Sequence, residues 1–239
     1  MTLFFDFLCR FAWGLAAALV VTPPRRVPAG FFRVNLLVVL GLATAAALLA
    51  RSASPGRLWP WPAAAAAVAW IGSVAWYAER ARAGLLSCVA CAVLLAVATV
   101  LVGPAGGHAA AARLLSGLLM GLTMHAMLLG HWYLNAPGMR VDVLRRMIDV
   151  ALAAWAAVLV AALAAVLWTG MPPGRGLGPT GFALLSLRWL AGLAGLPGLL
   201  MLSRKTLDIP NTQSATGILY VACLAAIVGE LAAQLLAAA

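Results

Sequence analysis

The sequence predicts an all-α, polytopic membrane protein with about eight spanning helices and no sizeable soluble domain. Of its 239 residues, 65% are hydrophobic and only 9% are charged, whereas a soluble domain carries about 25% charged residues. Apolar runs of spanning length, about 20 residues for a helix, recur along the chain. These runs lack the alternation of apolar and polar residues that is typical of β-barrel strands. Helices are therefore expected to cross the bilayer.

Eight apolar runs define the expected helices. The predicted spans cover residues 3–21, 34–50, 61–78, 84–102, 112–134, 148–169, 181–202 and 215–237. The first run begins with Phe-Phe-Asp-Phe rather than with the basic segment of a signal peptide, so we expect it to remain as a span. The connections are short and rich in Pro, Gly and Arg, so residues 1–239 are expected to form one integral membrane domain.

The distribution of basic residues predicts the orientation of the chain. Alternating the eight spans places ten basic residues on one side: Arg25, Arg26, Arg33, Arg80, Arg82, Arg140, Arg145, Arg146, Arg204 and Lys205. The other side receives four: Arg51, Arg57, Arg113 and Arg175. Cytoplasmic loops carry the excess of Lys and Arg. We therefore expect a bacterial-type cytoplasmic membrane with both termini on the non-cytoplasmic side.

The net charge of +10 does not indicate a nucleic-acid-binding protein. Nearly all of the basic residues lie in short loops between apolar runs, where they orient the chain and meet anionic lipid. The expected partners are the lipid bilayer and other membrane or peripheral subunits. The four cysteines lie inside apolar runs and are interpreted as small core residues.

Charged residues inside the spans are the first candidates for a site. Asp6 and Arg10 are four residues apart and can neutralise each other on one helix face. Arg188 and Glu230 each lie about seven residues, or roughly 10 Å, below the same membrane surface in consecutive spans. We therefore predict an Arg188–Glu230 ion pair, which either fixes helix register or forms part of a proton or ligand site.

The eighth span also carries a polar stripe. Its members recur at spacings of three and four and so share one helix face: Thr216, Tyr220, Cys223, Ile227, Glu230 and Gln234. This face is expected to look into the bundle. It would either line a cavity or hold helices together.

The fifth span has the densest set of unusual residues. Gly117, Gly121 and His125 follow at steps of four, which predicts a close helix contact with His125 beside it, near mid-membrane. Met120 and Met124 lie on a neighbouring stripe. His125, Met120 and Met124 are candidate metal ligands, for haem through one His and one Met or for Cu(I). The alternative is that the methionines fill space and that His125 is a hydrogen-bonded core residue.

A second group of candidates is expected at the inner membrane surface. The fifth span ends in His131, Trp132, Tyr133 and Asn135, and the polar string that includes Asn211 and Gln213 precedes the eighth span. Together these side chains predict a pocket with hydrogen-bonding groups, aromatic walls and nearby arginines. Such chemistry suits a quinone head group, an anionic lipid or a soluble partner.

No enzyme motif accompanies these residues, since the chain has no Walker loop, zincin or G-x-S-x-G sequence. In architecture alone, the chain resembles the membrane subunits of respiratory complexes, which implies contact with quinone or haem. The first hypothesis is therefore a membrane-embedded subunit of an electron-transfer or energy-converting complex. A small transporter, with Arg188, Glu230, His125 and a kink at Pro197 in its pathway, is the second. A structural membrane anchor without a ligand is the third.

Overall fold

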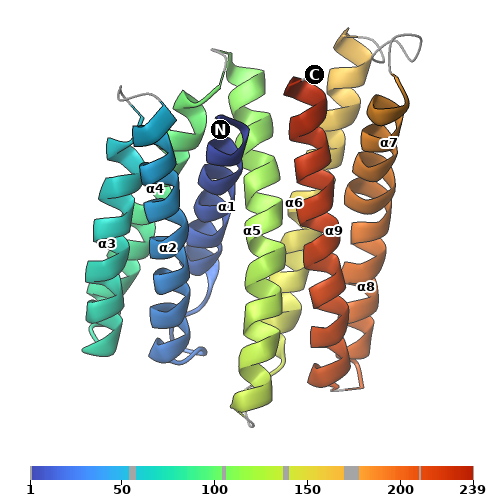
Figure 1. The fold of residues 1–239 in the computed structure, drawn as a ribbon. Helices are drawn as coiled ribbons and strands as arrows, with labels where there is room; N and C mark the ends of the chain where they lie inside the picture. The colour runs from blue at the N-terminus through green and yellow to red at the C-terminus, as the bar shows by residue number, and fades with distance from the viewer. Residues whose placement is uncertain are drawn as a thin grey trace.

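The computed structural model describes residues 2–53, 58–103, 106–136, 140–169, 178–209 and 211–238, and these residues form a bundle of long helices (Figure 1). The first half comprises α1 (Thr2–Val21), α2 (Ala29–Ala53), α3 (Pro60–Tyr77) and α4 (Ala81–Leu101). The second half comprises α5 (Gly107–Asn135), α6 (Asp142–Thr169), α7 (Pro179–Leu187), the π-helix η1 (Arg188–Gly195), α8 (Leu196–Thr206) and α9 (Thr212–Ala238). With α7, η1 and α8 taken as one segment, each helix begins and ends within about six residues of the corresponding predicted span. The apolar runs of the sequence thus determine where the helices lie.

Seven of the described helices are long and apolar enough to cross a membrane, with α7, η1 and α8 counted as one helix. The chain is thus an all-α integral membrane protein. The predicted third span is the exception, because two prolines, three tryptophans and a tyrosine lower the hydropathy of α3. This 18-residue helix nevertheless lies alongside α2 and α4 and packs on both (Figure 1).

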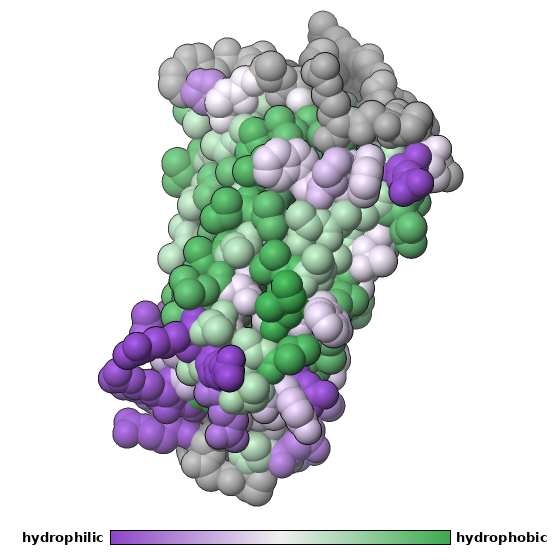
Figure 2. All heavy atoms as spheres, turned by 90° about the vertical axis from the view of Figure 1, so that its left-hand side faces the viewer, coloured by the Kyte–Doolittle hydropathy of each residue, from purple (hydrophilic) through white to green (hydrophobic). Residues whose placement is uncertain are grey.

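Both termini lie at one end of the bundle, which we call the outer end; the opposite end is the inner end (Figure 1). All ten basic residues assigned to one side by the sequence lie at the inner ends of helices. Figure 2 shows hydrophilic side chains gathered at the inner end below an apolar band. Of the four assigned to the other side, Arg51 and Arg113 are at the outer end, and Arg57 and Arg175 lie outside the described residues.

The centre of the bundle is the packing of α1 against α5. A Cβ built at Gly117 would lie 2.6 Å from the carbonyl oxygen of Arg10, and one at Gly121 would meet the backbone of Gly14. The predicted glycine contact on the fifth span is therefore confirmed, with α1 as the partner. It brings the N-terminal helix into the middle of the molecule, where α5 also contacts α4, α6 and α9.

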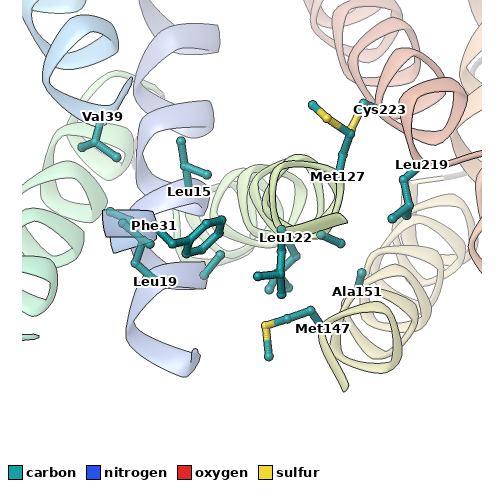
Figure 3. Packing of buried hydrophobic residues seen from close by; sticks show 14 of the residues in the cluster. Leu15, Leu19, Phe31, Val39, Leu122, Met127, Met147, Ala151, Leu219 and Cys223 are labelled. Carbon is teal, nitrogen blue, oxygen red and sulfur yellow. The ribbon is translucent and has the colours of Figure 1, made fainter. Parts of the chain in front are cut away.

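The largest core cluster surrounds α5 (Figure 3). Leu15 and Leu19 of α1, Leu122 and Met127 of α5, and Leu219 of α9 belong to it. The buried share of the apolar window is 61% in α5 but only 17% in α6 and 22% across α7–α8. Helix α6 and the segment α7–α8 thus pack less closely than the centre of the bundle. The candidate site lies where these loosely packed helices meet the centre.

Candidate functional site

A network of charged side chains joins the outer ends of α1 and α9. Arg10 binds Asp6 through two hydrogen bonds, Nε to Oδ1 at 3.1 Å and Nη2 to Oδ2 at 2.5 Å. Its Nη1 donates to Glu230 Oε1 at 2.6 Å, and Gln234 Nε2 donates to the same oxygen at 2.8 Å. The arginine thus neutralises two carboxylates that sit in the apolar part of the bundle. We call Asp6, Arg10, Glu230 and Gln234 the charged network.

This network corrects the predicted Arg188–Glu230 pair. Glu230 is paired with Arg10, and the described residues contain no ion pair or hydrogen bond from the Arg188 side chain. The prediction assumed that helices joined by a short loop supply each other's partners. The glycine contact between α1 and α5 instead brings Arg10 within reach of α9. The predicted Asp6–Arg10 pair is confirmed.

A cavity of about 350 Å³ lies beside the charged network, and we call it the outer cavity. Its polar lining comes from the four elements α1, α5, η1 and α9 and consists of Arg10, Arg113, Ser116, Arg188, Glu230 and Gln234. Most of the remaining lining residues are alanine, glycine or leucine. The small side chains at facing positions leave the space open, and the polar groups converge at its edge. Ligand sites combine these two features in volumes of about 300–1,000 Å³.

The outer cavity is bordered by α6 on one side and by η1 on the other. Helix α6 packs on α5 and α8, whereas α7 and η1 pack on α9. None of the residues of α7, all of which are described, is buried. Val158, Ala161 and Ala165 line the cavity from α6, and Gly192 lines it from η1. The cavity thus lies between the two least buried of the candidate spans.

The π-helical segment η1 shapes one wall of this cavity. Pro197 has no N–H for the carbonyl four residues earlier, that of Leu193, and Trp155 Nε1 of α6 donates to that carbonyl at 2.9 Å. The sequence predicted a kink here; the structure relieves the proline by widening the preceding turns into a π-helix. Close packing of Gly192 against Gly229 then fixes η1 on α9.

The polar stripe of α9 faces the bundle as predicted, with one exception. Thr216, Cys223, Glu230 and Gln234 are buried, whereas Tyr220 is exposed and its hydroxyl lies 3.3 Å from His131 Nδ1. Glu230 and Gln234 line the outer cavity, so that part of the stripe lines a cavity. Thr216 lies against Gly130 of α5 and belongs to a helix contact. The outer part of the stripe thus lines a cavity, and the inner part holds helices together.

His125 is a fully buried core residue whose ring lies beside the inner end of α1. Its Nε2 lies 2.7 Å from Thr22 Oγ1, which itself donates to the Ala18 carbonyl at 2.8 Å. Thr22 has a single hydroxyl proton, so Nε2 carries the imidazole proton and donates to Thr22. The ring also packs edge-on against Phe31, with 5.2 Å between centroids. This surrounding leaves no space for a haem at His125.

The other metal candidates are also dispersed. Met120 is buried and lines the outer cavity, whereas Met124 packs against both core clusters. Within the described part of the chain, no three His, Cys, Asp or Glu side chains are grouped to hold a metal ion. Met120 lines the outer cavity and His125 does not, so these two candidates have different surroundings.

The candidate residues of the predicted inner pocket contact several different neighbours. Tyr133 donates to the Arg140 carbonyl at 2.5 Å, Trp132 packs edge-on against Phe31, and Asn211 Oδ1 caps α9 by accepting from Ser214 N–H. Asn135 donates to the backbone of its own helix, and Gln213 is exposed. A cavity at this end is lined by other residues: Val141, Asp142, Arg145, Arg146, Asp149 and Leu207. A pocket built from the candidate residues stays a prediction.

The outer cavity also brings together residues that the sequence alone does not place in one site: Arg10, Arg113, Ser116 and Gln234. A signal was present, because Arg10 and Glu230 both lie about eight residues from the outer ends of their helices. Equal depth fits the observed pair as well as the predicted one. What the sequence lacks is the order of helices around α5.

Comparisons of the chain with protein-family models, with curated proteins and with solved structures gave no match.

Proposed function

We propose that this protein is a membrane-embedded subunit of an electron-transfer or energy-converting complex and that it binds a quinone in the outer cavity. The observation that carries the proposal is the lining of this cavity, which combines apolar side chains with hydrogen-bonding ones between α6 and η1. Quinones are dissolved in the bilayer and reach proteins from its side. We assign their entry to the boundary between α6 and η1, which belong to the least buried of the candidate spans.

The lining matches the two parts of such a ligand. Alanine and leucine side chains of α5, α6 and α9 offer an apolar surface for a ring and the start of an isoprenoid tail. Arg188, which has no partner among the described residues, offers N–H donors to a quinone carbonyl oxygen. Electrons exchanged with the quinone require a redox centre, such as a haem, an iron–sulfur cluster or a flavin, which we assign to a partner subunit.

The proposed setting is a bacterial-type cytoplasmic membrane with the basic inner end in the cytoplasm. This orientation follows the excess of Lys and Arg at the inner end. It places the outer cavity in the non-cytoplasmic leaflet. Reporter fusions at both termini test it, and a cytoplasmic C-terminus would contradict it.

A filled cavity provides the direct test of quinone binding. Ala161→Phe places a ring in the outer cavity, whereas the matched control Val160→Phe places it on the neighbouring position, which is 65% exposed. Protein in nanodiscs is incubated with a short-chain ubiquinone or menaquinone analogue, and the retained ligand is quantified after gel filtration. We expect retention by the wild type and by the control and its loss in Ala161→Phe. Equal retention by all three would contradict the proposal.

Native mass spectrometry of protein extracted gently from its own membrane tests the assembly. Co-purified subunits that carry a redox centre support the proposed role. A bare monomer or homo-oligomer would favour transport instead.

Transport is the second candidate, because an ion-pair network and a π-helical segment border one cavity. A transport route must continue to the inner end. His125 and its neighbours Thr22 and Met147 are buried in that half. Solute flux in proteoliposomes that is lost in Glu230→Gln would favour this candidate over quinone binding.

A further inference from the structure

Two oxygen atoms at the outer cavity lack hydrogen-bond donors. Gln234 is only 6% exposed, and its Oε1 is buried without a partner among the described residues. Glu230 uses Oε1 for both Arg10 and Gln234, and no described residue donates to its Oε2. Both residues line the outer cavity. Two residues of the cavity lining therefore carry acceptor oxygens to which no described residue donates.

The orientation of the Gln234 amide is fixed by its neighbour. Its nitrogen lies 2.8 Å from Glu230 Oε1, and a carboxylate oxygen accepts hydrogen bonds but donates none. Turning the amide over would bring two acceptors together and leave the NH₂ group buried without a partner. The free atom of Gln234 is therefore the carbonyl oxygen, and the group it lacks is a donor.

Oxidised and reduced quinones differ in whether they can donate hydrogen bonds. A quinone carries carbonyl oxygens, which only accept hydrogen bonds, whereas a quinol carries hydroxyl groups, which donate and accept. At Gln234 and Glu230 a carbonyl oxygen would face other acceptors. A hydroxyl group there satisfies one of them and still accepts from an arginine of the lining, such as Arg188.

We propose that the outer cavity selects the reduced, hydroxyl-bearing quinol over the oxidised quinone, with Gln234 and Glu230 as the acceptors that distinguish them. This inference rests on the proposed quinone binding. A site that hydrogen-bonds one form and leaves its polar groups unpaired with the other discriminates by roughly 10- to 100-fold. The protein would then hold the form of the ligand that gives up electrons.

The experiment compares the Kd values of one short-chain quinol and its quinone. Full-length protein in nanodiscs of neutral lipid is titrated anaerobically with each form. We expect the wild type to bind the quinol at least about tenfold more tightly. Gln234→Leu should lower this ratio toward one, and the matched control Gln213→Leu, on the exposed inner end of the same helix, should retain it.

A second readout does not depend on the variants. Tighter binding of the quinol raises the midpoint potential of the bound couple, by about 30 mV for each tenfold preference in a two-electron reaction.

Gln234→Met, which keeps the side-chain length, replaces Gln234→Leu in the titration if Gln234→Leu does not fold. Equal affinities, or tighter binding of the quinone, would overturn the selectivity and leave quinone binding intact. Binding of neither form would overturn the proposed function and this inference with it.

Discussion

The dense centre around α1 and α5 and the loose outer rim around α6 and η1 differ in the space beside their polar groups. In the centre, Thr22 and His125 share a hydrogen bond, and His125 Nδ1, which has no partner among the described residues, is enclosed in the core. At the rim, Gln234 Oε1 also has no partner among the described residues, and Gln234 lines a cavity together with Arg188 and Glu230. An unpaired polar group can bind another molecule only where there is space for that molecule. We therefore assign a structural role to the centre and recognition to the rim.

Breaking the charged network is expected to have the largest effect on stability. Arg10→Met leaves Asp6 and Glu230 as mostly buried carboxylates without a cation, at a cost of about 3–5 kcal/mol. The matched change Arg188→Met should cost less than about 1 kcal/mol, because Arg188 has no ion-pair partner among the described residues. Unfolding by SDS titration in micelles measures both. Equal destabilisation by the two changes would support the Arg188–Glu230 pair instead.

The glycine contact of the dense centre should tolerate no side chain. A Cβ at Gly121 meets the backbone of Gly14, which cannot move aside, so Gly121→Leu should destabilise the protein by about 3 kcal/mol. Gly41→Leu is the control, because its Cβ would meet nothing within 4 Å. The melting temperatures of the purified variants give the comparison. An unchanged value for Gly121→Leu would show that α1 and α5 are not in close contact.

His125 separates the structural centre from the binding rim. His125→Ala removes a buried ring and its hydrogen bond to Thr22, which should cost about 2 kcal/mol. Quinone retention by the folded fraction should be unchanged, because His125 does not line the outer cavity. His131→Ala, at an exposed position, is the control for stability. Loss of ligand from folded His125→Ala protein would place the site in the centre.

The smallest effect is expected at the hydrogen bond that supports η1. Trp155→Phe removes the donor to the Leu193 carbonyl and should cost about 1 kcal/mol. Because Leu193 lines the outer cavity, ligand affinity should fall together with stability. Trp70→Phe, at an exposed position on α3, should change neither. If Trp155→Phe left ligand affinity unchanged, η1 would not support the cavity wall.

The sequence predicts the helices well because spanning length and hydropathy are local properties of the chain. The Asp6–Arg10 pair was equally predictable, since residues four apart are neighbours on a helix. The partner of Glu230 was not predictable from the sequence, because it depends on how helices are ordered around α5. The inner pocket stays a prediction for a related reason, since the sequence does not give the neighbours of Trp132 and Tyr133, which are Phe31 and the Arg140 carbonyl.

The pairing of Arg10 with Glu230 also has a consequence for biogenesis. The two residues are separated by 220 positions, so the arginine enters the bilayer long before α9 has been translated. Until then Asp6, one turn away on α1, is the counter-ion that accompanies it. Insertion of the final helix adds the second carboxylate and joins the first and last segments of the chain. The ion pair thus marks completion of the bundle, and a nascent protein that stops before α9 lacks both this link and one wall of the cavity.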